Sequence, residues 1–187
     1  MRKTAAIALF AVASFGSILS AGELAPGTKA PAFSLVNAVD GEIVTLQPAD
    51  GKLKVLVFTS DRCEEAMAFE PRLIEIANRF GHKGAHLYLV NAGGGTMQMK
   101  ARAEEQEYPF PYVDDSDGSV ARAYGVRVAP DVFVLDGEGV VRYHGYIDDS
   151  AKPAERTAQP LTGALNALLN GREVANAETQ AFGCAIR

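Results

Sequence analysis

The run from Leu53 to Thr59 (LKVLVFT) constrains the fold more than any other part of this chain of 187 residues. It is almost continuously apolar and β-branched, a pattern typical of a strand buried on both faces of a helix-covered sheet. We therefore expect it to be the central strand. A helical pattern follows and continues to about Phe80. Asp61 and Glu64 have the spacing of a capping box, which places Cys63 in the first turn of that helix.

The rest of the chain alternates short strand patterns with helical patterns. This order predicts a single α/β domain in which a central mixed sheet is flanked by helices, with an N-terminal hairpin and a C-terminal tail. The predicted elements are a hairpin of Phe33–Val36 and Glu42–Leu46, a strand at Ala85–Asn91, a helix at about Thr96–Glu107, a short strand ending at Val113, a helix at Ser119–Tyr124, a hairpin of Asp131–Leu135 and Val140–Tyr146, and a last helix carrying Leu161, Leu165, Leu168 and Leu169.

The first residues have the pattern of an export signal. Arg2 and Lys3 precede an uncharged apolar stretch that ends near Leu19, and small residues follow at 20–22. We expect residues 1–21 to be a signal peptide cleaved after Ala21, leaving a domain at 22–187 in the periplasm or outside the cell. The apolar stretch is short for a membrane span and no later one approaches that length, so no stable membrane insertion is expected after cleavage.

Charge and composition narrow the classes of partner and cofactor. The formal net charge is −5, and loss of Arg2 and Lys3 with the signal peptide would make it −7. An acidic chain of this kind argues against nucleic acid as a partner. The three histidines, His82, His86 and His144, show no ligand pair at helical spacing, so neither a metal site nor a cofactor is predicted.

The two cysteines, Cys63 and Cys184, are the residues best suited to carry chemistry. A thiol at a helix start lies near unpaired backbone N–H groups, which favour the reactive thiolate. The positive charge of Arg62 also favours the thiolate, whereas the negative charges of Glu64 and Glu65 disfavour it. The sequence therefore does not show whether the thiol pKa is raised or lowered. The alternative is an inert buried cysteine, which is common for this residue type.

Several segments resemble known families. The strand before Cys63, the cysteine at the helix start and Pro71 eight residues later resemble the active-site segment of thioredoxin, and residues 125–135 resemble the loop that carries its cis-proline, which makes Pro130 the candidate cis residue. A closer resemblance is to the redoxin branch of the alkyl hydroperoxide reductase and thiol-specific antioxidant family, which is peroxiredoxin-like. The segments that carry it are Ala30–Leu35, Met99–Ala103, Pro109–Tyr112, Val120–Gly125, Tyr146–Asp149 and Phe182–Ile186.

This sequence departs from both families at the positions that carry their chemistry. Ala66 stands where a thioredoxin has its second cysteine, and Val57 stands in the place of its buried acid. The peroxiredoxin motif has a proline seven residues before the cysteine, but this chain has Leu56 there. Ser60 fits that motif, while Pro130 occupies the place of its arginine, for which Arg62 and Arg127 are candidate substitutes. Efficient peroxidase activity is therefore not expected.

The resemblance leaves Cys184 as the partner of Cys63. Three arrangements stay open: a redox couple in which Cys184 resolves the attack by Cys63, a structural disulfide that fixes the tail, and two unpaired thiols. The resemblance implies an extracytoplasmic thiol-disulfide oxidoreductase or weak thiol peroxidase with antioxidant activity, acting on protein thiols, disulfides or a peroxide. Its site residues would be Cys63, Cys184, Pro130, which shapes the substrate contact, and Arg62, which tunes the thiolate. The alternative is a non-catalytic binding module of thioredoxin fold.

Overall fold

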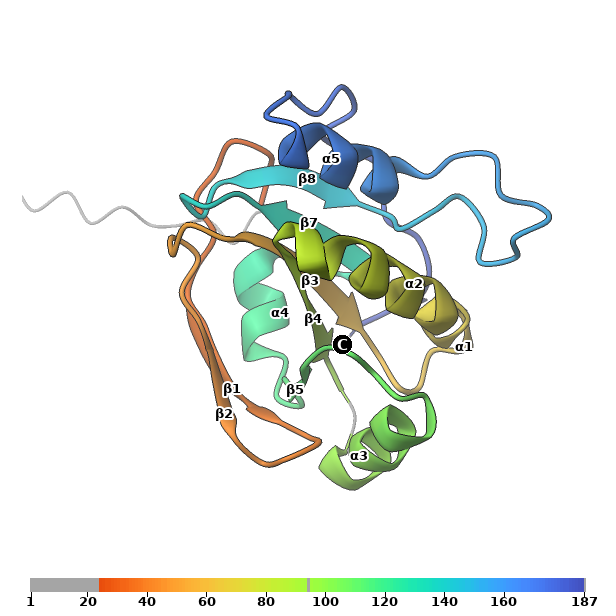
Figure 1. The fold of residues 1–187 in the computed structure, drawn as a ribbon. Helices are drawn as coiled ribbons and strands as arrows, with labels where there is room; N and C mark the ends of the chain where they lie inside the picture. Colours follow the sequence, from red (N-terminus) through yellow and green to blue (C-terminus); the bar gives the residue numbers. More distant parts are fainter. Residues whose placement is uncertain (1–23, 94, 187) are drawn as a thin grey trace, which may run out of the picture.

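The computed structural model describes residues 24–93 and 95–186, and the predicted signal peptide lies outside the described residues. A seven-stranded sheet has the order β2-β1-β5-β4-β3-β7-β8, and Figure 1 shows it between helices. The strands are β1 (Phe33–Asn37), β2 (Ile43–Leu46), β3 (Leu53–Thr59), β4 (Ala85–Asn91), β5 (Tyr112–Asp114), β7 (Asp131–Leu135) and β8 (Val141–Gly145). The predicted mixed α/β sheet is confirmed.

The strand β3 forms the interior of the sheet, as its apolar sequence predicts. It pairs in parallel with β4 along its whole length and antiparallel with β7 on the other side. Val55, Leu56, Val57 and Phe58 are at most 1% exposed, so both faces of the strand are buried. The middle position of the sheet belongs to the neighbouring β4 rather than to β3.

Helices cover both faces of the sheet. Apolar residues of α2 (Glu70–Phe80), α3 (Thr96–Glu105) and α5 (Pro160–Leu169) pack with Val55 and Val57 on one face. On the other face, α4 (Ser119–Tyr124) and the β1–β2 hairpin pack with Leu56 and Phe58. Figure 1 shows α2 and α4 on opposite sides of β3. No helix within the described part of the chain has the length and apolar character needed to span a membrane.

The helix predicted after β3 is divided into two. A short α1 (Glu64–Met67) has Ala68 as its C-cap residue, and α2 begins at Glu70. Pro71 lies in the first turn of α2, where its missing N–H removes the hydrogen bond that would join the two helices. The predicted capping box is also wrong, because Cys63 itself is the N-cap residue of α1 and so lies one position before its first turn.

The C-terminal tail forms a strand that sequence periodicity does not indicate. β9 (Cys184–Ala185) pairs antiparallel with β6 (Val128–Ala129), outside the main sheet. Before that, the tail runs beside the last residues of β8, where the backbone N–H of His144 donates to the carbonyl of Ala177 at 2.9 Å and that of Thr179 donates to the carbonyl of His144 at 2.9 Å. The tail therefore follows the edge of the sheet toward Cys63.

Candidate redox-active disulfide site

Cys63 lies between the end of β3 and α1. Its backbone is extended, with φ −109° and ψ 104°, and its Sγ accepts a hydrogen bond from the backbone N–H of Ala66 at 3.4 Å. The residue is 1% exposed. Since α1 has only four residues, this N–H group contributes more than a helix macrodipole would. A thiolate at Cys63 would keep this donor, which favours the ionised form.

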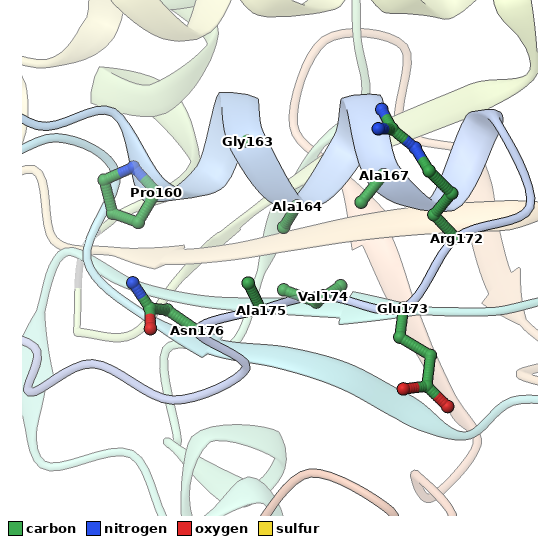
Figure 2. Close-up of a pocket in the computed structure, with 9 residues that line it drawn as sticks. All are labelled: Pro160, Gly163, Ala164, Ala167, Arg172, Glu173, Val174, Ala175 and Asn176. Atoms are coloured by element: carbon green, nitrogen blue, oxygen red, sulfur yellow. The ribbon is translucent and has the colours of Figure 1, made fainter.

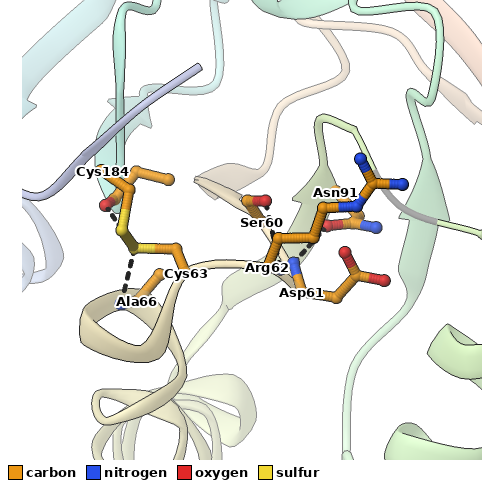
Figure 3. Close-up of a disulfide and its surroundings, with 8 residues drawn as sticks. Ser60, Asp61, Arg62, Cys63, Ala66, Asn91 and Cys184 are labelled. Atoms are coloured by element: carbon orange, nitrogen blue, oxygen red, sulfur yellow. Dashed lines mark hydrogen bonds between the residues drawn. A yellow bond between two sulfur atoms is a disulfide. The ribbon is translucent and has the colours of Figure 1, made fainter. Parts of the chain in front are cut away.

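Cys63 and Cys184 form a disulfide across a sequence separation of 121, with their Cα atoms 5.8 Å apart (Figure 3). The predicted pairing is confirmed, and the alternative of two unpaired thiols is wrong. Cys184 is partly exposed, unlike Cys63. Cys184 is therefore the more accessible of the two cysteines to molecules in solvent.

The loop before β7 completes the surroundings of the disulfide. The Ala129-Pro130 peptide bond is cis, as predicted for Pro130. The carbonyl oxygen of Ala129 lies 3.5 Å from Sγ of Cys63. A disulfide sulfur carries no proton, so this contact becomes a hydrogen bond only when Cys63 is a thiol. The carbonyl thus favours the thiol, whereas the N–H of Ala66 favours the thiolate.

Backbone N–H groups of the loop at Ser60–Arg62 are hydrogen-bonded to side-chain oxygens. The N–H of Asp61 donates to Oδ1 of Asn91 at 3.0 Å, and the N–H of Arg62 donates to Oγ of Ser60 at 3.3 Å. Figure 3 shows the guanidinium of Arg62 directed away from the disulfide, on the side of Asn91. The predicted effect of Arg62 on the thiolate stays a prediction.

A polar pocket of about 730 Å³ lies beside this loop. It contains Arg102, which donates to both carboxylate oxygens of the buried Glu70 at 2.7 Å. This pairing raises the pKa of Arg102 above its usual range, so the guanidinium is a fixed cation. The pocket is lined by Asp61, Arg62, Met67, Gly95, Gln98, Ala101, Arg102 and Glu105.

The tail is anchored on both sides of Cys184. The ring of Phe182 packs against those of Phe69 and Tyr146, with centroids 6.4 and 5.6 Å apart. Beyond the cysteine, the N–H of Ile186 donates to the carbonyl of Arg127 at 2.9 Å. These contacts bring a distant segment against the Cys63 loop, although the sequence of the tail has weak periodicity.

Other cavities and polar clusters lie apart from the cysteines. Figure 2 shows a pocket of about 330 Å³ between α5 and the segment after it. It offers no thiol, and its residues are Pro160, Gly163, Ala164, Ala167, Arg172, Glu173, Val174, Ala175 and Asn176. Within 24–93 and 95–186, no group of three or more His, Cys, Asp or Glu residues is placed to hold a metal ion.

Comparison with known proteins identifies the family. The sequence pattern of the AhpC/TSA family matches residues 26–144, which is more than half of the chain and includes Cys63 and Pro130. The chain belongs to the AhpC/TSA family. Cys184 and the tail lie beyond the matched segment.

Relatives of this AhpC/TSA chain include thiol-disulfide oxidoreductases. It is 26% identical to the thiol-disulfide oxidoreductase ResA of Bacillus thuringiensis over 115 residues, covering 62% of this chain and 66% of the relative. A crystal structure of an uncharacterized conserved protein from Geobacillus kaustophilus has a TM-score of 0.81 at 30% identity, covering 88% of this chain and 92% of that one. The thioredoxin domain of a thiol-disulfide oxidoreductase from Bacteroides vulgatus has a TM-score of 0.58 at 26% identity, covering 64% and 86%. The predicted thioredoxin-like fold is confirmed.

Two residues beside the site, Phe182 and Gly183, lie in a segment that carries the family resemblance, but sequence reasoning assigned them no role. Gly183 has a positive φ of 138°, and a Cβ there would lie 2.0 Å from the carbonyl oxygen of Ala129. Its signal in the sequence is a glycine directly before Cys184. The packing of Phe182 could not be predicted from the tail alone, because its partners Phe69 and Tyr146 come from the N-cap of α2 and from the loop after β8.

Proposed function

We propose that this protein is an extracytoplasmic thiol-disulfide oxidoreductase in which Cys63 attacks and Cys184 resolves. The observation that carries the proposal is the disulfide itself, which joins a cysteine at a helix N-cap to a partly exposed cysteine beside cis-Pro130. The ResA relatives support the same class of chemistry. The pattern of residues 1–21 supports export of a domain at 22–187.

The reductive reaction uses two successive exchanges. In the reduced protein, the Cys63 thiolate attacks one sulfur of a substrate disulfide, and the other substrate sulfur leaves as a thiolate that takes a proton from water. The Cys184 thiolate then attacks Cys63, which releases the second substrate thiol and forms the Cys63–Cys184 bond. Two electrons have passed to the substrate, and a dithiol protein must supply two more for the next cycle.

Reduction of the protein proceeds from the other sulfur. Cys63 is 1% exposed and Cys184 is partly exposed, so the incoming thiolate attacks Cys184. Cys63 then leaves as a thiolate that accepts the N–H of Ala66. A leaving thiol with a stabilised anion leaves faster, so the helix start assists this step. The second thiolate of the dithiol donor attacks the donor sulfur bound to Cys184, which forms the donor disulfide and releases Cys184 as a thiolate.

A peroxide is the other substrate of the proposal. The Cys63 thiolate would attack the peroxide O–O bond to give a sulfenic acid and an alcohol or water, and Cys184 would condense with it to give the same disulfide and water. The site lacks the peroxiredoxin proline, because β3 carries Leu56 there. We therefore propose this antioxidant activity as slow compared with disulfide exchange.

A non-catalytic binding module is the competing function. The burial of Cys63 and the anchoring of the tail by Phe182 favour it, because both are also expected of a permanent structural disulfide. In that case the missing second cysteine at Ala66 would reflect lost catalysis. The two functions differ in whether the disulfide opens under physiological conditions.

The deciding experiment is a redox titration of the mature protein in graded thiol buffers, followed by alkylation and mass spectrometry. A midpoint above about −300 mV, a range that includes thioredoxin-like oxidoreductases, supports a working couple, and one below about −300 mV indicates a structural disulfide. Insulin reduction by wild type, Cys63→Ser and Cys184→Ser then tests the roles. Cys63→Ser should lose all activity, and Cys184→Ser should form one mixed disulfide and stop. The exposed Ala185→Ser is the matched control and should retain activity.

A further inference from the structure

The tail occupies a short strand edge directly beside the nucleophile. Cys184 lies opposite Ala129 and Ala185 lies opposite Val128 in the antiparallel β6–β9 pair. The Ile186 N–H bond to the carbonyl of Arg127 extends that pairing by one residue. The edge of β6 therefore holds an extended segment so that its cysteine meets Cys63. This is β-strand addition, in which backbone bonds supply affinity and side-chain positions supply selectivity.

Each residue of the occupying segment meets a different surface. Phe182 packs against Phe69 and Tyr146. Gly183 lies where a Cβ would come within 2.0 Å of the Ala129 carbonyl oxygen, so a larger residue is excluded there. Ala185 is exposed, and Ile186 packs against the buried cluster that contains Cys63. The surroundings of β9 therefore constrain four residues of the segment and leave one, the exposed Ala185, unconstrained. The four constrained residues are Phe182, Gly183, Cys184 and Ile186.

We propose that β9 is an internal copy of the substrate, and that reduced protein accepts on β6 an extended polypeptide segment of the form aromatic-Gly-Cys-any-aliphatic. This inference rests on the proposed function and names the substrate class of the same site. The oxidised protein has the geometry of the mixed disulfide, with Cys184 in the place of the substrate cysteine. A bound segment and the tail compete for one edge, so release of product is coupled to return of the tail.

The exchange is balanced without a further reactant. The Cys63 thiolate attacks the cysteine sulfur of a segment whose cysteine is in a disulfide. The sulfur that was bonded to that cysteine leaves as a thiolate, and the segment pairs with β6. The Cys184 thiolate then attacks Cys63 as β9 returns to the same edge, and the segment leaves as a thiol. Glycine has no side chain to meet the Ala129 carbonyl in either complex.

The test uses the reduced mature protein with Cys184→Ser, which traps the mixed disulfide at Cys63. The probes are the peptide Ala-Phe-Gly-Cys-Ala-Ile and two matched peptides, one with Ala for Gly and one with Ser for Ile. Each carries 5-thio-2-nitrobenzoate on its cysteine as a coloured leaving group. N-acetylcysteine with the same leaving group gives the baseline, and free glutathione as attacking thiol corrects for peptide reactivity.

We expect the Gly-Cys peptide to react at least about tenfold faster than the Ala-Cys peptide, a difference of one decade in transition-state affinity. The Ser-for-Ile peptide should lie between them, and peptide mapping should place the adduct on Cys63. Equal corrected rates for the Gly and Ala peptides, with reaction of the baseline probe, would overturn the inference and leave the oxidoreductase intact. No reaction with any probe would remove the proposed function and this inference together.

Discussion

The two halves of the disulfide are held by different kinds of structure. Cys63 follows β3, the strand with both faces buried, and precedes helices that pack on the main sheet. Cys184 lies in a two-residue strand on a tail outside that sheet. One half is therefore positioned by the core, and the other is positioned by contacts that a partner could replace. For the proposed exchange, this difference predicts that Cys63 stays in place and that the tail moves.

The largest expected effect comes from the aromatic pair that joins the two halves. Phe69 is 1% exposed at the start of α2, whereas Phe182 is partly buried on the tail. Phe69→Ala should lower the free energy of unfolding by about 3–5 kcal/mol, because it leaves a cavity in the core. Phe182→Ala should lower it by about 1–3 kcal/mol, because Phe182 contacts the two rings of Phe69 and Tyr146 at about 0.5–1.5 kcal/mol each. Denaturant unfolding of the oxidised proteins measures both.

An equal loss of unfolding free energy in Phe69→Ala and Phe182→Ala would contradict the distinction between the core and the tail. That result would mean that the tail is as much a part of the folded core as α2. Phe110→Ala is a control for aromatic truncation elsewhere, since Phe110 packs on Tyr108 and belongs to the same core cluster as Phe69. It should behave like Phe69→Ala.

The cross-link itself should contribute the next largest effect. Cys63→Ser and Cys184→Ser remove the same bond between residues separated by 121 positions, so each should lower the free energy of unfolding by about 2–4 kcal/mol. The serine at 63 keeps an acceptor for the N–H of Ala66. Thermal or denaturant unfolding, compared with wild type in dithiothreitol, measures the loss. A much larger loss in either variant than in reduced wild type would show that the cysteine also packs in a way that serine cannot reproduce.

Sequence patterns predict the surroundings of Cys63, which the core holds in place, better than the surroundings of Cys184 on the tail. The run Leu53–Thr59 specifies its own burial, because its side chains are apolar on both faces of a strand. β6 and β9 have two residues each, which is too short for any period to be visible, and their pairing arises from contacts between distant segments. The Cys63–Cys184 pairing could be proposed from the resemblance but not chosen among three arrangements.

Local competition explains the errors near Cys63. Asp61 and Glu64 have capping-box spacing, but the N–H of Asp61 bonds to Asn91 on another strand, and the sulfur of Cys63 takes the capping position. The spacing alone cannot show which side chain reaches the free N–H groups. The division between α1 and α2 also follows from tertiary packing, since Phe69 points into the core at that break.

A glycine on the tail gives a smaller and more local effect. Gly183→Ala should disfavour the closed tail, because φ is 138° and the new Cβ would meet the Ala129 carbonyl. The reduction midpoint of the disulfide should become less negative by about 30 mV, which is about 1.4 kcal/mol for two electrons. Redox titration with alkylation measures the shift.

Gly171→Ala is the matched control for backbone strain. Gly171 also has a positive φ, of 66°, but a Cβ there would meet nothing within 4 Å. It should lower stability without moving the midpoint. If both variants moved the midpoint equally, general strain rather than contact with the Ala129 carbonyl would be the cause, and the tail would not be selective at that position.

The smallest expected effect concerns α2, the helix that follows Cys63 and α1. It tests whether an ion pair on this helix also stabilises the fold. Nη1 of Arg72 on α2 donates to Oε2 of Glu75 at 2.6 Å, and this hydrogen bond holds the pKa of Glu75 below its usual value. A carboxylate with a lowered folded-state pKa stabilises the fold above its unfolded pKa, and that contribution is lost as pH falls through the folded value. Since Glu75 is 57% exposed, Glu75→Gln should cost only about 0.5 kcal/mol at pH 7 and nothing near pH 2. Chemical unfolding across this range measures it, with Glu155→Gln as the control for removing an exposed paired carboxylate. A cost independent of pH would assign the contribution of Glu75 to packing rather than charge.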